Sequence, residues 1–551
     1  MSDRTLNWGE SEAAARYQTG DDDPDGGDFI VAKNTDNETV LLQWDNTAEQ
    51  WVFAGDVDLG GNDVTNAGVV SGVDGSFDTL EADRSVTKET PVLEVDAFGA
   101  VGDGTADDTQ AIKDAINSVG EDANAVLAFS GAKEYLISER LTIDITRIKG
   151  VVGRNARLTL DGDFEGLRLL GNVTDGGGSP GGPQDEREEQ FPFIQNLHIR
   201  GPDEDPYLGT GIVLENTYGT KIRGCSIYNL DIGLAWEDYN RDCSVHDNSF
   251  WDNRNYNIHM RPGHDIHQLK INDNYLGYAF KPIFNEDAEL EDMLFQNNLI
   301  ETGISEQKVS TAHLHLQSLT DGNNLKNNLI TGNQFQCHGE VDNALVWFEN
   351  ETANNNCELN KISNNEFTDT GTGDGLRYEN GRSLTVTDNE FNNIGGDCVN
   401  IIDVERNFKI SNNSAWECDN AFSRIKLSGN IGSSSIVNNT ISFHSGLFID
   451  YNINGGNLNA TSLSDNVVFN LNEPSGPLLE VSGSSDIFSL RVNNNSITCT
   501  DGEGAIVIDT STPDLFTATE NIARNFDDTE VPIFDFPAES ETVIVRDNIN
   551  N

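Results

Sequence analysis

Copies of one short motif, centred on a pair of asparagines, recur along most of this chain and constrain its fold more than any other feature. The clearest copy reads Ile-Ser-Asn-Asn-Glu-Phe-Thr-Asp over residues 362–369. Within each copy apolar and polar residues alternate around the pair, which is the periodicity of a half-buried strand. The second asparagine recurs in steps of 24–37 residues, at positions 248, 274, 298, 328, 365, 389, 413, 439 and 466.

A repeat of this length predicts stacked units, because a unit so short buries its apolar face only against its neighbours. β-Branched and aromatic residues dominate, and no 3.6-residue apolar rhythm runs through the repeats, which argues against helical and leucine-rich repeats. Asn suits a tight corner because it tolerates left-handed backbone geometry, and stacked Asn side chains bond from one coil to the next. The sequence therefore predicts an all-β fold, a parallel β-helix with coils of about 24–30 residues. A sandwich with evenly spaced strands is the alternative, but it does not require an Asn pair at every turn.

The chain is strongly acidic, with 92 Asp and Glu against 34 Lys and Arg and a net charge of −58. This charge opposes binding to nucleic acid or to an anionic membrane, and it resembles the surfaces of proteins from extreme halophiles. Residues 1–20 contain no apolar run, so neither a signal peptide nor membrane insertion is expected. The seven cysteines show no disulfide framework and no zinc-type CxxC pair; Cys398 and Cys418 are expected to be small buried residues.

Residues 1–55 are expected to form a small separate module. Residues 13–17 suggest a short helical turn, and the segments 39–44 and 50–54 alternate around Asp45-Asn46 as a hairpin does. The acidic stretch that begins at Asp21 matches the first half of an EF-hand loop, but its twelfth position is Ala32 instead of Glu. We therefore expect a solvated acidic turn there, no calcium site, and no cofactor for the protein as a whole.

Residues 95–116 read as a strand, a Gly/Asp turn and a helix. Asp107 or Asp108 can cap that helix, and an apolar stripe follows at Ala111, Ile112, Ala115, Ile116 and Val119. The pattern Phe-Gly-Ala-x-Gly-Asp-Gly-x-x-Asp-Asp-Thr-x-Ala-Ile over 98–112 resembles the N-terminal cap of the pectate-lyase-like superfamily, which includes polygalacturonases and many phage tailspikes. The resemblance implies a right-handed parallel β-helix over residues 91–551, closed by a cap over 95–119.

A second resemblance concerns residues 57–70, which read Val-Asp-Leu-Gly-Gly-Asn-Asp-Val-Thr-Asn-Ala-Gly-Val-Val. They are similar to a short motif of bacteriophage tail fibres that lies in an intertwined trimeric stalk; a plain Gly/Asn turn is the alternative. The resemblance implies a stalk or linker over 56–90, a homotrimer, and an N-terminal module over 1–55 that attaches to tail or baseplate proteins of a virion.

A second strand of each coil supplies the candidate site. In five-residue copies such as Leu-Val-Trp-Phe-Glu (345–349), positions two and four are apolar and should face inward, and positions three and five should face solvent. Position five then forms an outward column: Glu215, Glu237, Arg261, Gln317, Glu349, Glu379, Ile402, Asp450 and Asp509.

Glu349 and Glu379 fall on consecutive coils, so their carboxyl groups could lie ~5 Å apart, near the spacing in a retaining glycosidase; a one-coil gap would suit an inverting one. Carboxylates so close should raise one pKa, as a general acid requires. Trp347 and Arg377 would stand beside them and suit a sugar ring and an anionic sugar. Glu237 and Arg261, in the same column, complete the predicted glycan-binding surface. The alternative, which we favour, is an acidic face that is merely solvated.

The resemblance to polygalacturonases provides a further comparison. Arg424-Ile425-Lys426 matches one of their motifs, and Gly395-Gly396-Asp397 echoes their paired-Asp segment with one acid missing. Their Gly-His-Gly is absent, which argues against that activity and leaves Asp397 as a minor catalytic candidate. His313 and His315 are placed on one strand face, but without a third ligand they predict no metal site.

The sequence thus predicts a trimeric tail spike or fibre of a virus of halophilic archaea, located in the virion tail and meeting the host surface. Its partners would be virion tail or baseplate proteins and a host surface glycan or S-layer glycoprotein. The alternative is a polysaccharide-degrading enzyme, a glycoside hydrolase or lyase, for which no complete catalytic motif is found.

Overall fold

The computed structural model divides the chain into two units, residues 1–90 and 91–551. It describes residues 91–470 except for 121–123, 174–191, 203–206, 303–311, 321–322, 339–340, 352–356, 428–430, 444–448 and 454–457. Beyond 470 it describes 489–499, 515–525 and short strands, and before 91 it describes strands alone.

The first unit contains a five-stranded antiparallel sheet, β1 (Arg4–Asn7), β2 (Ala14–Gln18), β3 (Phe29–Lys33), β4 (Thr39–Asp45) and β5 (Gln50–Phe53). The predicted hairpin is confirmed, since β4 pairs with β5 and Trp44 lies opposite Trp51. The helical turn expected at 13–17 is wrong: this segment is β2, which gains main-chain hydrogen bonds from neighbours on both sides. The acidic stretch 21–28 lies outside the described residues. Within 57–70 the structure describes a two-stranded ribbon, β6 (Val57–Asp58) and β7 (Asp63–Val64).

A cap closes the N-terminal end of the second unit, as predicted. It contains β8 (Val92–Glu94), the 3₁₀ turn η1 (Val95–Phe98), β9 (Asp103–Asp107) and the helix α1 (Thr109–Asn117). Ile112, Ala115 and Ile116 of α1 are buried, and the carboxylate of Asp107 accepts a hydrogen bond from the backbone N–H of Thr109 (3.0 Å). The strands β10 (Ala125–Ala128), β11 (Glu134–Ile137) and β13 (Ile148–Leu160) form the first coils beneath it.

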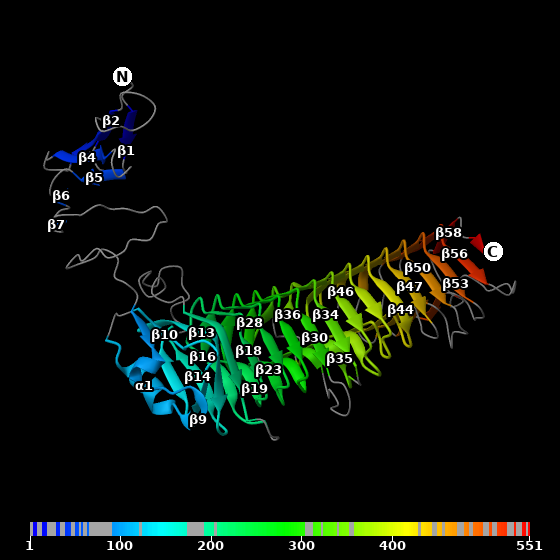
Figure 1. Cartoon of the computed structure of the whole chain (residues 1–551). Coiled ribbons are helices and arrows are strands. Elements are labelled where there is room, and N and C mark those ends of the chain that lie inside the picture. Colours follow the sequence, from blue (N-terminus) through cyan, green and yellow to red (C-terminus); the bar gives the residue numbers. More distant parts are fainter. Residues whose placement is uncertain are drawn as a thin grey trace. The chain divides into compact units, whose positions relative to one another are not determined.

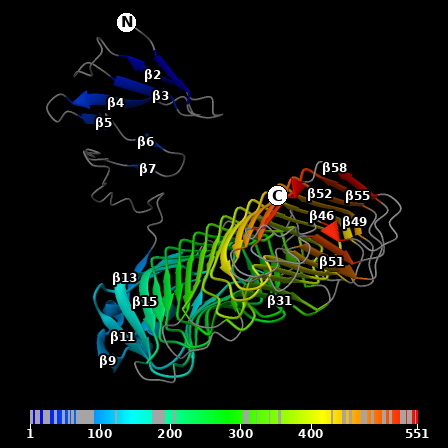
Figure 2. The ribbon, with the colours of Figure 1, turned by 90° about the vertical axis from the view of Figure 1, so that its right-hand side faces the viewer.

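From there the chain winds as a right-handed parallel β-helix with three strand-bearing faces (Figure 1, Figure 2), which confirms the predicted fold class. The third face is a parallel sheet of fifteen strands. Its strands are β12 (Leu141–Asp144), β14 (Glu165–Leu170), β16 (Thr210–Glu215), β19 (Ile232–Glu237), β23 (Tyr256–Met260), β27 (Lys281–Asn285), β31 (Ala312–Ser318), β35 (Ala344–Asn350), β39 (Asp374–Glu379), β42 (Val399–Ile402), β45 (Ser423–Leu427), β48 (Ile449–Ile453), β51 (Leu479–Gly483), β54 (Ile506–Asp509) and β57 (Phe534–Asp535).

The first face and the second face meet at the Asn corner. The first face consists of part of β15 (Phe193–Arg200), then β17 (Lys221–Arg223), β21 (Ser244–His246), β25 (Lys270–Asn272), β29 (Leu294–Gln296), β33 (Leu329–Thr331), β37 (Asn360–Ser363), β40 (Ser383–Thr387), β43 (Asn407–Ser411), β46 (Ile431–Val437), β49 (Leu458–Ser464), β52 (Ser489–Asn493), β55 (Leu515–Thr519) and β58 (Val543–Arg546). The second face consists of β18 (Ser226–Tyr228), β22 (Ser249–Trp251), β26 (Tyr275–Gly277), β30 (Leu299–Thr302), β34 (Gln334–Cys337), β38 (Glu366–Thr368), β41 (Glu390–Asn392), β44 (Ser414–Cys418), β47 (Thr440–Phe443), β50 (Val467–Asn470), β53 (Ser496–Cys499), β56 (Ile522–Asn525) and β59 (Ile549–Asn550). A small sheet, β20 (Tyr239–Arg241), β24 (Asp265–His267), β28 (Glu289–Glu291), β32 (Leu325–Lys326) and β36 (Cys357–Glu358), lies between the third face and the first along the chain.

The two residues of each corner pair have different roles. The first residue of the pair adopts left-handed geometry, as at Asn364 (φ 55°) and Asp388 (φ 58°). The second is buried and forms a ladder, in which Asn365 Nδ2 donates to Asn389 Oδ1 and Asn389 Nδ2 donates to Asn413 Oδ1, both at 3.0 Å. The ladder runs through positions 248, 274, 298, 333, 365, 389, 413, 439, 466, 495 and 521.

The prediction that Asn328 belongs to this ladder is wrong. Asn333 fills that position, and Asn328 bonds instead to Asn360 (3.0 Å) at a different corner. In this coil Asn328 follows β32 of the small sheet, and Asn333 directly precedes β34 of the second face. The coil therefore has two Asn-bearing corners, and the motif alone does not distinguish them.

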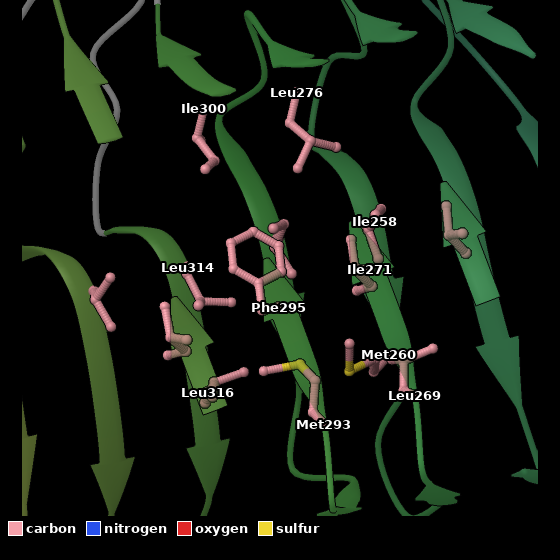
Figure 3. Packing of buried hydrophobic residues seen from close by; sticks show 14 of the residues in the cluster. Ile258, Met260, Leu269, Ile271, Leu276, Met293, Phe295, Ile300, Leu314 and Leu316 are labelled. Carbon is pink, nitrogen blue, oxygen red and sulfur yellow. The ribbon is translucent and has the colours of Figure 1, made fainter. Parts of the chain in front are cut away.

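Inward side chains of the three faces stack in rows along the coil axis. Figure 3 shows such rows: Ile258 and Leu314 belong to one row of the third face, with Ile283 between them, and Phe295 lies beside Ile271 in a row of the first face. On the second face Phe335, Phe367 and Phe391 form another row, with ring centroids 4.7–5.2 Å apart. Cys398 and Cys418 are buried, as predicted.

Strand pairing adds coils that the sequence alignment of the third face omitted. Between β16 and β54 these are β27, β45 and β51, and the inward positions of β27 and β45 include Asn285 and Ser423 in place of apolar residues. The alignment also placed the copy at 446–450 two residues out of register: Ile449 lies opposite Ser423, so Asp450 stands at position three, opposite Arg424, and not at position five.

Candidate functional site

The candidate residues that the sequence predicted lie on the strands of the third face or directly beside them. Trp347 lies opposite Arg377 across β35 and β39, and Phe348 lies opposite Tyr378. Glu349 and Glu379 follow these pairs directly, so they stand on adjacent strands as expected. In the same register Arg377 lies opposite Asn400, and Asn400 lies opposite Arg424.

Position three of the third-face strands forms an outward column, which contains a stack of planar side chains. His259 and Phe284 are parallel with centroids 5.8 Å apart, and His315 and Trp347 are parallel at 4.2 Å. The Arg377 guanidinium lies 5.5 Å from the centroid of the Trp347 ring. Because His315 and Arg377 take the faces of Trp347, and the residue is 9% exposed, a sugar has little access to this ring.

The carboxylate of Glu349 is held by its neighbours. Its Oε2 atom lies 2.9 Å from His315 Nε2 and accepts a hydrogen bond from Gln317 Nε2 at 2.7 Å. Burial works to raise the pKa of Glu349, but these hydrogen bonds outweigh it and hold the pKa below its usual range. The expected rise of a pKa is therefore not found at Glu349, because a hydrogen-bonded carboxylate stays charged. Glu379 Oε1 accepts a hydrogen bond from Arg377 Nε (2.6 Å).

Glu237 and Arg261 belong to an ion-pair network nearer the cap. They bind each other, and Glu237 also binds Arg168. Arg168 Nη1 lies 2.7 Å from Glu165 and Arg168 Nη2 lies 2.5 Å from Glu215. The predicted pair is thus engaged by charged partners of its own chain.

A second cluster lies on four consecutive strands, β39, β42, β45 and β48 of the third face. Asp397, just before β42, is 4% exposed, and Asp374 at the start of β39 is 8% exposed. The backbone N–H of Asp397 donates to Asp374 Oδ1 (2.8 Å), and Asn400 Nδ2 donates to Asp374 Oδ2 (2.8 Å). Arg424 Nε lies 3.0 Å from Asp397 Oδ2 and 3.5 Å from Asp450 Oδ2.

The electrostatics of this cluster suit proton transfer. Burial, reinforced by the negative charge of Asp374, raises the pKa of Asp397 to about 7, although Arg424 and the backbone N–H of Ala421 oppose the rise. Burial also raises the pKa of Asp374. A carboxyl group poised near neutral pH can donate and accept a proton, as a general acid or base must. The sequence named Asp397 and Arg424 separately but missed Asp374, which has no motif around it.

His313 and His315 have different surroundings. His313 is fully buried, contacts Thr302 Oγ1 at 2.8 Å, and burial lowers its pKa to about 3. His315 belongs to the outward stack, so the expectation that the two share a face is wrong; the strand register skips residue 313. Among the described residues, Asp265, His267 and Glu289 bring three ligand atoms within 4.8 Å.

Comparison with known families yields one partial match. Residues 194–357 match a family described as periplasmic copper-binding protein (NosD). This is less than half of the chain. The group at Asp265 lies in the matched range and offers one imidazole nitrogen and two carboxylate oxygens as donors. No curated protein sequence matches the chain.

Solved structures with a similar fold include tailspikes, adhesins and glycan-active enzymes. The catalytic unit of a thermostable GH87 α-1,3-glucanase from Streptomyces thermodiastaticus is 14% identical, with a TM-score of 0.34 over 84% of this chain and 68% of that one. The Streptococcus pneumoniae surface adhesin PfbA is 14% identical (TM-score 0.32, covering 82% and 100%). A tailspike protein of E. coli bacteriophage HK620, solved with a pentasaccharide, is 9% identical (TM-score 0.35, covering 82% and 78%). At these values the similarity concerns the β-helix fold alone.

Among the described residues, the helix that the structure contains is too short to cross a membrane.

Proposed function

We propose that the protein is a tail spike or tail fibre that binds a host surface glycan or glycoprotein through the third face of its β-helix. In this proposal the module at residues 1–55 docks on virion tail or baseplate proteins, and residues 56–90 form the stalk of a homotrimer. The protein would act in the virion tail of a virus whose host lives in high salt. The tail-fibre-like stretch 57–70 and the net charge of −58 support this reading.

One observation carries the glycan-binding part of the proposal. Over four consecutive strands of one face, carboxylate, guanidinium and amide groups stand in contact, and Glu349, Arg377 and Arg424 remain 26%, 28% and 32% exposed. Sugar hydroxyls need directional donors and acceptors held in fixed geometry. Side chains that are already hydrogen-bonded to one another provide that geometry at a small entropic cost.

A second function, cleavage of the bound glycan, is favoured by Asp397. Its pKa of about 7 allows it to protonate a glycosidic oxygen at neutral pH, and Asp374 or Asp450 would act as the second carboxylate. Glu349 and Glu379, the pair predicted from sequence, then bind the glycan and do not perform the proton transfer, since the pKa of Glu349 is lowered.

The test is binding and turnover of surface glycan purified from candidate halophilic hosts, in multimolar salt. Immobilised glycan reports binding, and reducing ends or unsaturated products report cleavage. D397N, E349Q and E379Q are compared with E390Q, a matched carboxylate-to-amide change on the second face, where Glu390 is exposed. We expect weaker binding in E349Q and E379Q, loss of any product in D397N, and no change in E390Q. Equal binding by all four variants would contradict the third face as the ligand surface.

The oligomeric state of the protein tests the proposal that it is a homotrimeric spike. Light scattering of the whole chain in high salt should give three times the mass of one chain. A monomer that still binds glycan would contradict the trimeric spike but leave the binding face in place.

A further inference from the structure

The first face of the β-helix differs in charge from the rest of the protein. From β17 to β52 its strands align two outward columns through eleven coils, one from Lys221 to Arg491 and the next from Arg223 to Asn493. None of these 22 positions is Asp or Glu. Because 92 of the 551 residues are acidic, one in six, 22 positions would on average hold about four. We call these two columns the acid-free face.

Cations recur along the acid-free face. The first column carries Lys221, Lys270, Lys361, Lys409 and Arg491. Within the described part of the chain none of these five side chains forms an ion pair with Asp or Glu, whereas Lys113 and Lys133 near the cap, and most arginines, do. In a chain where acids outnumber bases by 92 to 34, cations without acidic partners are available for an external anion.

The second half of this face is hollowed. A groove of about 740 Å³ crosses the strands from β37 to β52, with Lys361, Lys409 and Arg491 in its lining. Between these cations lie Thr385, Ser435 and Ser462, whose hydroxyl groups donate and accept hydrogen bonds. The groove lining within the described residues contains no Asp or Glu.

We propose that the acid-free face binds a linear anionic polysaccharide, one that bears carboxylate or sulfate groups, along the coil axis. Lys361 and Lys409 are two strands apart, ~9.6 Å at the spacing of neighbouring strands, so successive charged sugars meet successive cations. The intervening hydroxyls bond sugar hydroxyls or anionic oxygens. This inference rests on the proposed function only in choosing a glycan as the polyanion, and its face is separate from the cluster at Asp397.

Two alternatives for this face are weaker. Duplex DNA carries one negative charge about every 1.7 Å of its axis, a density that the five cations of the first column, spread over eleven coils, do not match. A second copy of the chain could place an acidic face against these cations. The cations would then already be covered before any ligand is added. The groove and the hydroxyl groups that lie between its cations favour the glycan, and labelling separates the two cases.

The test compares dextran sulfate with neutral dextran, because these polymers share one backbone and differ in charge. The full-length protein is titrated in a series of salt concentrations, and polygalacturonate serves as a carboxylated probe. The variant K361Q/K409Q/R491Q removes the groove cations. The control K113Q/R154Q/R254Q removes the same charge elsewhere, at residues outside the acid-free face.

We expect dextran sulfate to bind the native protein more weakly as salt rises, and neutral dextran not to bind this face. The groove variant should bind dextran sulfate at least tenfold more weakly and with a smaller salt dependence, while the control keeps native affinity. Bound dextran sulfate should protect Lys361 and Lys409 from amine acetylation, which mass spectrometry locates, and leave Lys113 reactive.

Three results would overturn the inference: native affinity in K361Q/K409Q/R491Q, equal binding of both dextrans, or slow acetylation of Lys361 and Lys409 in the free protein. The last would assign the face to contact with another copy. If D397N or E349Q alone loses host glycan while the groove variant keeps it, the proposed function stands and the inference falls. If only the groove variant loses dextran sulfate and host glycan, the inference stands and the third face is not the ligand surface.

Discussion

Arg424 Nε lies 3.0 Å from Oδ2 of Asp397, and these two residues come from adjacent coils of the third face. The same nitrogen lies 3.5 Å from Asp450. The guanidinium therefore offsets part of the repulsion among carboxylates, but burial dominates, and the pKa of Asp397 still rises to about 7. The balance of these effects makes the cluster sensitive to pH.

The first prediction concerns the pH dependence of stability. The folded-state pKa of Asp397, about 7, lies above the ordinary value of 3.8, so the folded protein binds more protons than the unfolded chain between these values. The contribution of Asp397 is fully present below pH 3.8 and is lost as pH rises through 7. D397N, which keeps a neutral side chain, should lack this loss and become more stable than the native protein at pH 8.

Urea midpoints between pH 4 and pH 9 measure the effect. D388N is the control, since Asp388 is exposed at a corner and its replacement Asn keeps left-handed geometry. If the urea midpoints of D397N and the native protein differ by the same amount at every pH, the pKa of Asp397 is not shifted by folding.

The second prediction concerns Glu349. Its pKa is lowered, so its effect on the pH dependence of stability is opposite to that of Asp397. Its contribution to stability is present above the ordinary pKa of 4.5 and is lost as pH falls through the lower folded value. E349Q should therefore be less stable than the native protein at pH 7, and the difference should shrink as the solution becomes acidic. The same change should lower the pKa of His315 further, because the bond to Glu349 raises it; His ring resonances in NMR spectra report that pKa.

The third prediction concerns the asparagine ladder. Asn389 donates to Ile362 O and Asn413 Oδ1 and accepts from the backbone and side-chain N–H groups of Asn365, each at 3.0 Å. N389A leaves these buried groups unsatisfied, at about 1–3 kcal/mol each. We expect a clearly lower urea midpoint and local opening of the coils on either side. Hydrogen exchange that stays unchanged at Asn365 and Asn413 would contradict this role.

The fourth prediction concerns the outward stack. Trp347 is 9% exposed and lies between His315 and Arg377, so W347A removes a large buried side chain at a cost of about 3–5 kcal/mol. W347F keeps an aromatic ring and should lose much less. Because the ring faces are already occupied, W347F should bind glycan like the native protein. Tenfold weaker binding by a fully folded W347F would instead show that a sugar contacts the ring.

Some of the site could be predicted from sequence. The placement of Glu349 beside Glu379 and of Trp347 beside Arg377 followed from strand alternation within neighbouring copies. The contact between Asp397 and Arg424 did not, because an inward Ser423 hid the β45 coil, and a two-residue error in the register of β48 placed Asp450 in the wrong column. The acid-free face was also missed, because its columns are visible only when residues from eleven coils are aligned by pairing.

The sequence by itself determined the β-helix, its cap and its Asn corner, because these depend on short motifs whose geometry is local and repeats in every coil. The tertiary structure alone decided which coils lie in contact, since connections of unequal length change the sequence separation between stacked residues from 23 at Asp374 and Asp397 to 35 at Asn298 and Asn333. That stacking sets the pKa of Asp397 and aligns in one column five cations that form no ion pair with the described acids, and neither arrangement is contained in a single motif.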